Sequence, residues 1–246
     1  MSVSTAEEAR DALEGGADIV DAKDPHAGAL GPVTLDTLAA IHRVVGRTRL
    51  LTAALGDIEE GSGLRALGSG TEIESLAYAY ASAGAGLVKM GCAGGVAAAR
   101  DGLASAVRGA GRAGAGVVAV TYADANGPAA VTLDTVIELA LAAGARGVLV
   151  DTANKSGPGL TSLVRIEQLT AWTARARQSG LLAAVAGSLS VDQLPAVAAS
   201  GADVVGVRGA ACEGGRLGRI TAWRVASLSA RLRLFAGTPA VFQGSP

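Results

Sequence analysis

The sequence predicts an α/β fold, a single (β/α)8 TIM barrel, and three observations favour this fold class. The length of 246 residues suits one such barrel, whose typical size is about 250 residues. Apolar, β-branched runs alternate with amphipathic segments, as in a parallel sheet with a helix between successive strands. An internal repeat, in which a Gly-Ala pair follows a helical stretch and opens a strand, recurs at Gly16, Gly84, Gly144 and Gly201.

The repeat favours a closed barrel over an open doubly wound sheet, which is the alternative. Its copies lie 57 to 68 residues apart, which is about twice the ~30 residues of one strand-helix unit in an eight-unit barrel. Evenly spaced, equivalent units suit a rotationally regular barrel. Glycine is also the residue expected just past the C-terminus of a helix, because it adopts a left-handed backbone at no steric cost.

The strands and helices follow in order along the chain. Seven strands are expected, at 18–21, 50–55, 86–89, 117–122, 147–151, 181–186 and 203–207. Eight helices are expected, at 5–14 (with Ser4 and Glu7 as a capping box), 34–45, 71–82, 95–109, 132–143, 161–178, 190–199 and 221–235. The eighth strand must precede Thr5, so strand 1 is expected to be short or clipped at the N-terminus. Residues 1–235 are expected to form one barrel domain, and 236–246 a flexible tail.

Composition excludes several function classes. A net charge of −1 and an aromatic content of 3% argue against nucleic acid and against an anionic membrane as partners. The apolar runs are far shorter than the ~20 residues that span a bilayer. Cys92, Cys212, His26 and His42 form no metal-binding motif, so we expect no metal, no cofactor and a reducing, cytoplasmic location. The sequence does not determine the oligomeric state, and a homo-oligomer is compatible with it.

Lysine is scarce in this chain, and its positions are informative. The three lysines are Lys23, Lys89 and Lys155, although the chain is rich in arginine. All three fall at or just after the carboxyl end of a predicted strand, where barrels place their active sites. Because arginine is never deprotonated, a lysine retained there points to an amine that acts as a nucleophile or a base.

The register of the repeat predicts which side chains face the barrel interior. Counted from the repeat glycine, Asp21 and Lys89 occupy position five, and Lys23, Asp151 and Arg208 occupy position seven. Because strand side chains alternate with period two, these five share one face, and the valines between them suit the outer face. The sequence therefore predicts a charged cluster inside the barrel mouth, and such a cluster is costly without pairing or function.

Two glycine-rich segments predict a phosphate site. Gly187 and Ser188 follow strand 7, and the segment from Gly206 to Gly209, which includes Arg208, follows strand 8. Loops after strands 7 and 8 are the usual phosphate site of barrel enzymes, where backbone N–H groups surround the anion. Two alternatives remain open: the glycines only form tight turns, and Arg208 pairs with a carboxylate.

With these residues identified, the chain resembles the (5-formylfuran-3-yl)methyl phosphate synthase family of methanofuran biosynthesis. The matching stretches are 15–25, 150–157, 186–188 and 201–215. The resemblance implies a barrel, related to class I aldolases, that joins two molecules of glyceraldehyde 3-phosphate into a phosphorylated furaldehyde with loss of phosphate and water. It also implies that Lys23 forms the Schiff base and that Lys89 accepts a proton, with Asp21, Asp151 and Lys155 as supporting residues.

Other interpretations stay open at this stage. Lys155 instead of Lys23 could carry the imine. An isomerase or lyase with a phosphate site could use acid–base chemistry without an imine, and borohydride trapping would separate the two mechanisms. A non-catalytic sugar-phosphate-binding protein is the third interpretation, which substrate turnover would exclude.

Overall fold

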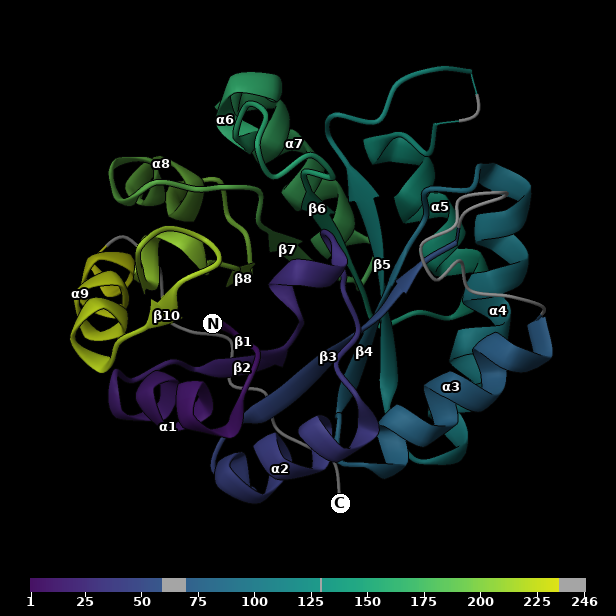
Figure 1. Ribbon diagram of the computed structural model, residues 1–246. Helices are drawn as coiled ribbons and strands as arrows, with labels where there is room; N and C mark the ends of the chain where they lie inside the picture. The colour runs from purple at the N-terminus through teal and green to yellow at the C-terminus, as the bar shows by residue number, and fades with distance from the viewer. Residues whose placement is uncertain (59–69, 129, 235–246) are drawn as a thin grey trace.

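A computed structural model describes residues 1–58, 70–128 and 130–234, and its centre is one parallel sheet. The eight strands pair in chain order, as the sequence predicted (Figure 1). They are β1 Ser2–Val3, β2 Ile19–Ala22, β3 Leu50–Asp57, β4 Leu87–Gly91, β5 Gly116–Tyr122, β6 Gly147–Asp151, β7 Leu182–Val185 and β8 Val204–Val205. The predicted tail, 236–246, lies outside the described residues.

The first strand is short, as predicted, and it closes the ring. Ser2 and Val3 pair with Asp21 and Ala22 of β2. On the other side, the Ser2 N–H donates to the carbonyl of Val207, just beyond β8, at 3.1 Å. The first and last strands thus meet, which agrees with the predicted (β/α)8 architecture.

Helices surround the sheet (Figure 1). They are α1 Ala6–Glu14, α2 Leu35–Val45, α3 Gly70–Ser82, α4 Val96–Arg112, α5 Leu133–Ala143, α6 Leu160–Leu163, α7 Ile166–Gln178, α8 Leu194–Ala199 and α9 Ala222–Arg233. The single helix predicted over 161–178 is wrong, because Val164 is extended (φ −125°, ψ 123°) and separates α6 from α7. The helix predicted over 190–199 begins as a 3₁₀ turn, Val191–Gln193.

The four repeat glycines have the backbone conformation that the repeat suggested. Their φ angles are 77° at Gly16, 108° at Gly84, 75° at Gly144 and 82° at Gly201. Side chains with a Cβ rarely adopt these angles, so glycine lets the chain leave a helix and enter the next strand.

The apolar core has two parts, and their arrangement positions the site. Val20, Val88 and Val148 pack in the larger part, outside the barrel, as predicted. The smaller part lies inside and includes Leu30 and Tyr122, together with Ala54 of β3 and Val120 of β5. Because Leu30 comes from the loop after β2, that loop folds inward and fills part of the barrel.

The loop after β8 contains a two-stranded hairpin that the sequence did not predict. Its strands are β9 Cys212–Glu213 and β10 Arg219–Ile220. Gly214 and Gly215 adopt φ angles of 79° and 81° in the connecting turn. These two glycines therefore serve the turn of the hairpin.

The start of α1 differs by one residue from the predicted capping box. Thr5 is the N-cap, and its hydroxyl accepts the N–H of Glu8 at 3.2 Å. The Glu8 carboxylate, and not that of Glu7, accepts the N–H of Ser4 at 2.7 Å. Glu8 is thereby turned inward and is 4% exposed, which places a carboxylate beside the seam between β1 and β8.

Candidate active site

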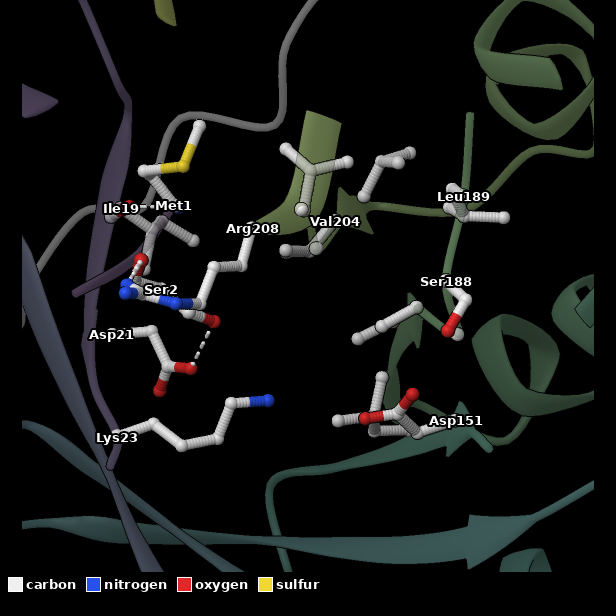
Figure 2. Close-up of a pocket in the computed structure, with 18 of the residues that line it drawn as sticks. Met1, Ser2, Ile19, Asp21, Lys23, Asp151, Ser188, Leu189, Val204 and Arg208 are labelled. Carbon is white, nitrogen blue, oxygen red and sulfur yellow. Dashed lines mark hydrogen bonds between the residues drawn. The ribbon is translucent and has the colours of Figure 1, made fainter. Parts of the chain in front are cut away.

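A cavity of about 500 Å³ occupies the barrel interior and opens at the carboxyl ends of the strands. The structure brings all ten predicted site residues to its lining, and Figure 2 labels five of them, Asp21, Lys23, Asp151, Ser188 and Arg208. They are Asp21, Lys23, Lys89, Asp151, Lys155, Gly187, Ser188, Gly206, Arg208 and Gly209. The predicted inward face of the strands is therefore confirmed.

Asp21 and Lys89 form a buried ion pair between β2 and β4. The Lys89 Nζ lies 2.6 Å from Asp21 Oδ2. Two hydroxyls also donate to the carboxylate, Thr52 Oγ1 at 2.7 Å and Ser2 Oγ at 2.8 Å. Burial alone would raise the pKa of Asp21, but the charges of Lys89 and Lys23 and these hydrogen bonds hold it well below its usual range. Asp21 therefore remains a carboxylate.

Asp151 and Lys155 form a second ion pair at the end of β6, with Nζ and Oδ1 2.5 Å apart. The two residues are four positions apart in one loop. Asp124, at the end of β5, holds that loop, because its carboxylate accepts the N–H groups of Ala153 and Asn154 at 2.7 and 2.8 Å. The position of the Lys155 amine thus depends on a carboxylate outside the ion pair.

Lys23 lies between the two pairs, but its side-chain amine has no partner among the described residues, neither a hydrogen bond nor an ion pair. Its side chain extends into the cavity (Figure 2), and the residue is 7% exposed. Burial lowers the pKa of Lys23 to about 8, with the Asp151 carboxylate opposing this shift and the Lys89 charge adding to it. At pH 7, about a tenth of such amines are neutral, against about three in ten thousand for an ordinary lysine.

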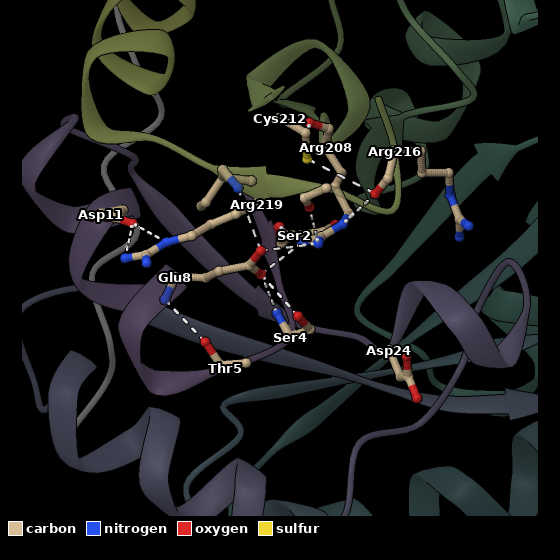
Figure 3. A network of polar contacts seen from close by, with 12 residues as sticks. Ser2, Ser4, Thr5, Glu8, Asp11, Asp24, Arg208, Cys212, Arg216 and Arg219 are labelled. Atoms are coloured by element: carbon tan, nitrogen blue, oxygen red, sulfur yellow. Dashed lines mark hydrogen bonds and ion pairs between the residues drawn. The ribbon is translucent and has the colours of Figure 1, made fainter. Parts of the chain in front are cut away.

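Arg208 is pointed at a carboxylate, which is the alternative that the sequence left open. Its guanidinium binds both oxygens of Glu8, at 2.8 and 3.0 Å (Figure 3). The remaining contacts are to the carbonyls of Ser2, Arg216 and Gly218. A guanidinium has five N–H groups, and all five of these have acceptors within the protein. No donor of Arg208 is left for a phosphate in this structure.

The predicted phosphate-binding glycines differ in what they offer. The N–H groups of Gly187, Ser188 and Gly209 donate to no acceptor within the described ranges. Gly187 and Ser188 have φ angles of 121° and 49°, so both lie in the positive-φ region. The Gly206 N–H, in contrast, donates to the Val185 carbonyl at 2.8 Å. Gly206 thus lines the cavity but supplies no free N–H donor.

Several residues of the site were missed by sequence reasoning. Thr52 had a usable signal, because it is the register partner of Asp21 on the neighbouring strand. Glu8 had none, since it meets Arg208 only through barrel closure, 200 residues away in sequence. Arg216 was also missed, although it lines the cavity and its guanidinium donates to the carbonyls of Pro25 and Gly28.

The Cys92 thiol and the Tyr122 hydroxyl both have raised pKa values. Burial raises the pKa of Cys92 to about 12, so its thiol stays protonated. Burial followed by the nearby Asp57 carboxylate raises the pKa of Tyr122 well above its usual value. Within the described ranges, no cluster of three or more His, Cys, Asp or Glu side chains could hold a metal ion. No helix there is long and apolar enough to cross a membrane.

Known proteins with this fold support the architecture. A solved 3-hexulose-6-phosphate synthase superposes with a TM-score of 0.63 at 22% identity, covering 96% of this chain and 97% of its own. A deoxyribose phosphate aldolase from Aeropyrum pernix gives a TM-score of 0.59 at 16% identity, with 95% and 88% covered. At these identities the likeness shows the barrel fold alone.

Sequence relatives are more specific. The 4-HFC-P synthase family matches residues 1–229. The (5-formylfuran-3-yl)methyl phosphate synthase of Methanothermobacter thermautotrophicus is 35% identical over 218 residues, which is 87% of this chain and 89% of that protein. The enzyme of the same name from Methanocaldococcus jannaschii is 35% identical over 219 residues, with 87% and 90% covered. The chain therefore belongs to the 4-HFC-P synthase family of lyase-type enzymes.

Proposed function

We propose that this enzyme condenses two molecules of glyceraldehyde 3-phosphate into (5-formylfuran-3-yl)methyl phosphate through an imine on Lys23. The atoms balance when one phosphate and two waters are released. The observation that carries the proposal is the state of the Lys23 amine. It is buried, it has no partner within the described structure, and burial lowers its pKa to about 8. The two lysines with carboxylate partners are ammonium ions and weaker candidates for the nucleophile.

The first step forms the imine. The neutral Lys23 amine adds to the carbonyl carbon of one substrate molecule, and the resulting carbinolamine loses water. Lys89, an ammonium ion beside Asp21, is suited to give a proton to the departing hydroxyl. The iminium then draws electrons from the neighbouring carbon and acidifies its C–H bond.

The second step uses that acidity. Lys89, now a neutral amine, takes the C–H proton, and the enamine that forms holds the electron pair. This pair expels the phosphate from the third carbon and leaves an unsaturated iminium. The second substrate molecule, once a base has removed the proton from its C2 carbon, supplies the electron pair for the new carbon–carbon bond, and the iminium takes up the electrons as an enamine. Asp21 stays ionised throughout and stabilises the returning charge on Lys89.

Ring closure, the loss of two waters that makes the furan, and the hydrolysis that returns the first water and frees Lys23 need another proton donor and acceptor. The Lys155–Asp151 pair is on the opposite side of Lys23 from the first pair and lines the same cavity. Its ammonium and carboxylate suit the transfer of a proton to a leaving hydroxyl and the removal of a ring proton.

One substrate phosphate is held by the backbone. The N–H groups of Gly187, Ser188 and Gly209 have no acceptor in the described chain and lie on the loops after β7 and β8. Such N–H groups bind phosphate well, since they are fixed dipoles that need no reorganisation. Arg208 contributes indirectly, by holding the second loop against Glu8.

Turnover and trapping test this proposal together. Purified enzyme with glyceraldehyde 3-phosphate should release one phosphate for every two substrate molecules consumed and accumulate a furaldehyde with its ultraviolet absorbance. Borohydride should then add the mass of the reduced substrate adduct to Lys23. Phosphate release without adduct would favour acid–base chemistry, and an adduct at Lys155 would move the imine there. Binding without any turnover would leave a sugar-phosphate-binding protein.

A further inference from the structure

The cationic side chains of the cavity are not equally neutralised. Lys89, Lys155 and Arg208 each have a carboxylate within 2.5 to 2.8 Å. Arg216 lines the same cavity, yet its guanidinium meets no carboxylate in the described part of the chain. A partly buried charge without a counter-ion is costly, and an anionic ligand would remove that cost.

Arg216 is held across the mouth of the barrel. It belongs to the turn of the β9–β10 hairpin, and its Nη1 and Nη2 donate to the carbonyls of Pro25 at 2.7 Å and Gly28 at 2.9 Å. Both carbonyls lie in the loop that follows Lys23. Figure 3 shows the Arg216 side chain pointing away from the Glu8 carboxylate that binds Arg208. The guanidinium is therefore fixed in place by neutral groups, and three of its five N–H groups remain for a ligand.

Its surroundings reinforce this interpretation. Burial, followed by the positive charge of Arg208, lowers the pKa of the Arg216 guanidinium. The more distant Asp151 and Asp24 carboxylates oppose this shift, but neither forms an ion pair with Arg216. Arginine stays protonated at neutral pH, so the charge persists without a carboxylate in contact. Arg219, three residues further along the same hairpin, pairs with Asp11 at 3.0 Å and is exposed. Only Arg216 of these two faces the cavity.

We propose that Arg216 binds the phosphate of the second substrate molecule, an inference that rests on the function proposed above. The molecule that forms the imine must enter first, because Lys23 lies deep in the cavity. The second molecule then binds between the first and solvent, where the half-buried Arg216 joins the two loops. Planar guanidinium N–H groups suit a phosphate, since they bind two of its oxygens at once.

Anion binding without chemistry gives the most direct test. Calorimetry with glycerol 3-phosphate, which has no carbonyl and forms no imine, should find two sites per wild-type chain. Arg216→Met should keep one site and weaken the other by about 10- to 100-fold, as expected for losing hydrogen bonds to a charged group. Arg216→Lys should recover part of this loss, and the matched control, Arg219→Met, should bind as wild type. Two unchanged sites in Arg216→Met would overturn the inference, even if turnover were normal.

Kinetics separates this inference from the function on which it rests. In Arg216→Met, the glyceraldehyde 3-phosphate concentration that half-saturates borohydride trapping of Lys23 should stay within about twofold of wild type. The concentration that half-saturates furaldehyde formation should rise about 10- to 100-fold. If trapping weakens as much as turnover, Arg216 acts on the first molecule and the assignment is wrong. If wild-type enzyme shows no adduct on any lysine but retains two anion sites, the imine fails and the Arg216 site survives.

Discussion

Two buried charged clusters flank the short strand β1, and they differ in one respect. In the seam cluster, Glu8 and Arg208 are 4% and 7% exposed, and every N–H of the guanidinium has an acceptor. In the cavity cluster, Lys23 is as deeply buried, but its amine has no partner among the described residues. Lys23 and Arg208 follow strands at the carboxyl end of the barrel, and Glu8 lies in the first turn of α1, which follows β1.

Burial has a different consequence in each cluster: the Glu8–Arg208 pair stabilises the fold, whereas the Lys23 amine becomes more reactive. Glu8 is buried, which would raise its pKa, but the hydrogen bonds and charge of Arg208 outweigh burial and lower it. Both partners therefore stay charged and hold β1 against the loop after β8. At Lys23 the Asp151 and Asp21 charges oppose burial but do not outweigh it, so burial lowers the pKa of the amine toward neutrality and makes it nucleophilic.

The largest effect is expected for Lys23→Arg, which removes the nucleophile and keeps the charge. Turnover should fall by at least about 10⁴-fold, since removing a nucleophile usually costs this much or more. Borohydride should add no mass. The variant should still fold, because the cavity has room for the longer side chain. Substrate turnover and the midpoint of thermal unfolding are the measurements, and an active, trappable Lys23→Arg enzyme would refute the nucleophile assignment.

The seam should respond through stability. Glu8→Ala leaves the Arg208 guanidinium buried without a counter-ion, and such changes lower the free energy of unfolding by about 3–5 kcal/mol. Asp11→Ala is the matched control, because it breaks the more exposed pair with Arg219 and should cost about 1 kcal/mol or less. Urea unfolding measures both. If both variants lost the same free energy of unfolding, the buried Glu8–Arg208 pair would stabilise the fold no more than the more exposed Asp11–Arg219 pair.

Lys89→Arg should separate imine formation from proton transfer. The arginine can still pair with Asp21 but cannot become a neutral base, so turnover should fall by about 10²- to 10⁴-fold. Lys23 should still be trapped by borohydride, although more slowly, because its own amine is intact and water can replace Lys89 as the proton donor in imine formation. Loss of trapping together with turnover would show that Lys89 is needed to form the imine itself.

The smallest effect is expected for Thr52→Val, which removes one of the hydrogen bonds to the Asp21 carboxylate. A hydrogen bond to a charged group contributes about 1.5–3 kcal/mol, and Ser2 and Lys89 remain bound to the carboxylate. The free energy of unfolding should fall by no more than this amount, with the Lys23 adduct preserved. A complete loss of turnover in a folded Thr52→Val protein would show that the hydroxyl has a direct role in catalysis.

Much of this architecture was predictable from local signals. The repeat glycines marked the ends of helices, and alternation along each strand placed Asp21, Lys23, Lys89 and Asp151 on the inner face. These inferences succeed because a positive φ and a two-residue period are properties of short segments.

Pairing could not be predicted in the same way. The sequence put Asp21, Lys23 and Lys89 in one cavity but could not show that Asp21 pairs with Lys89, 68 residues away, and leaves Lys23 alone. Arg208 reaches Glu8 only after the barrel closes. The hairpin that carries Arg216 likewise depends on how the loop after β8 packs, so neither periodicity nor a motif predicts it.

The pH dependence of borohydride trapping, mapped to its residue, tests the central claim most directly. Reduction of the imine blocks cleavage by trypsin after Lys23, so the adduct should appear on a peptide spanning 11–43 in place of 11–23 and 24–43. A pKa lowered to about 8 means that the amine is protonated below this pH and neutral above it, so the trapping rate should rise with pH and level off above about 8. An adduct on Lys155 or Lys89, no adduct on any lysine, or a rate still rising at pH 10 would contradict the account.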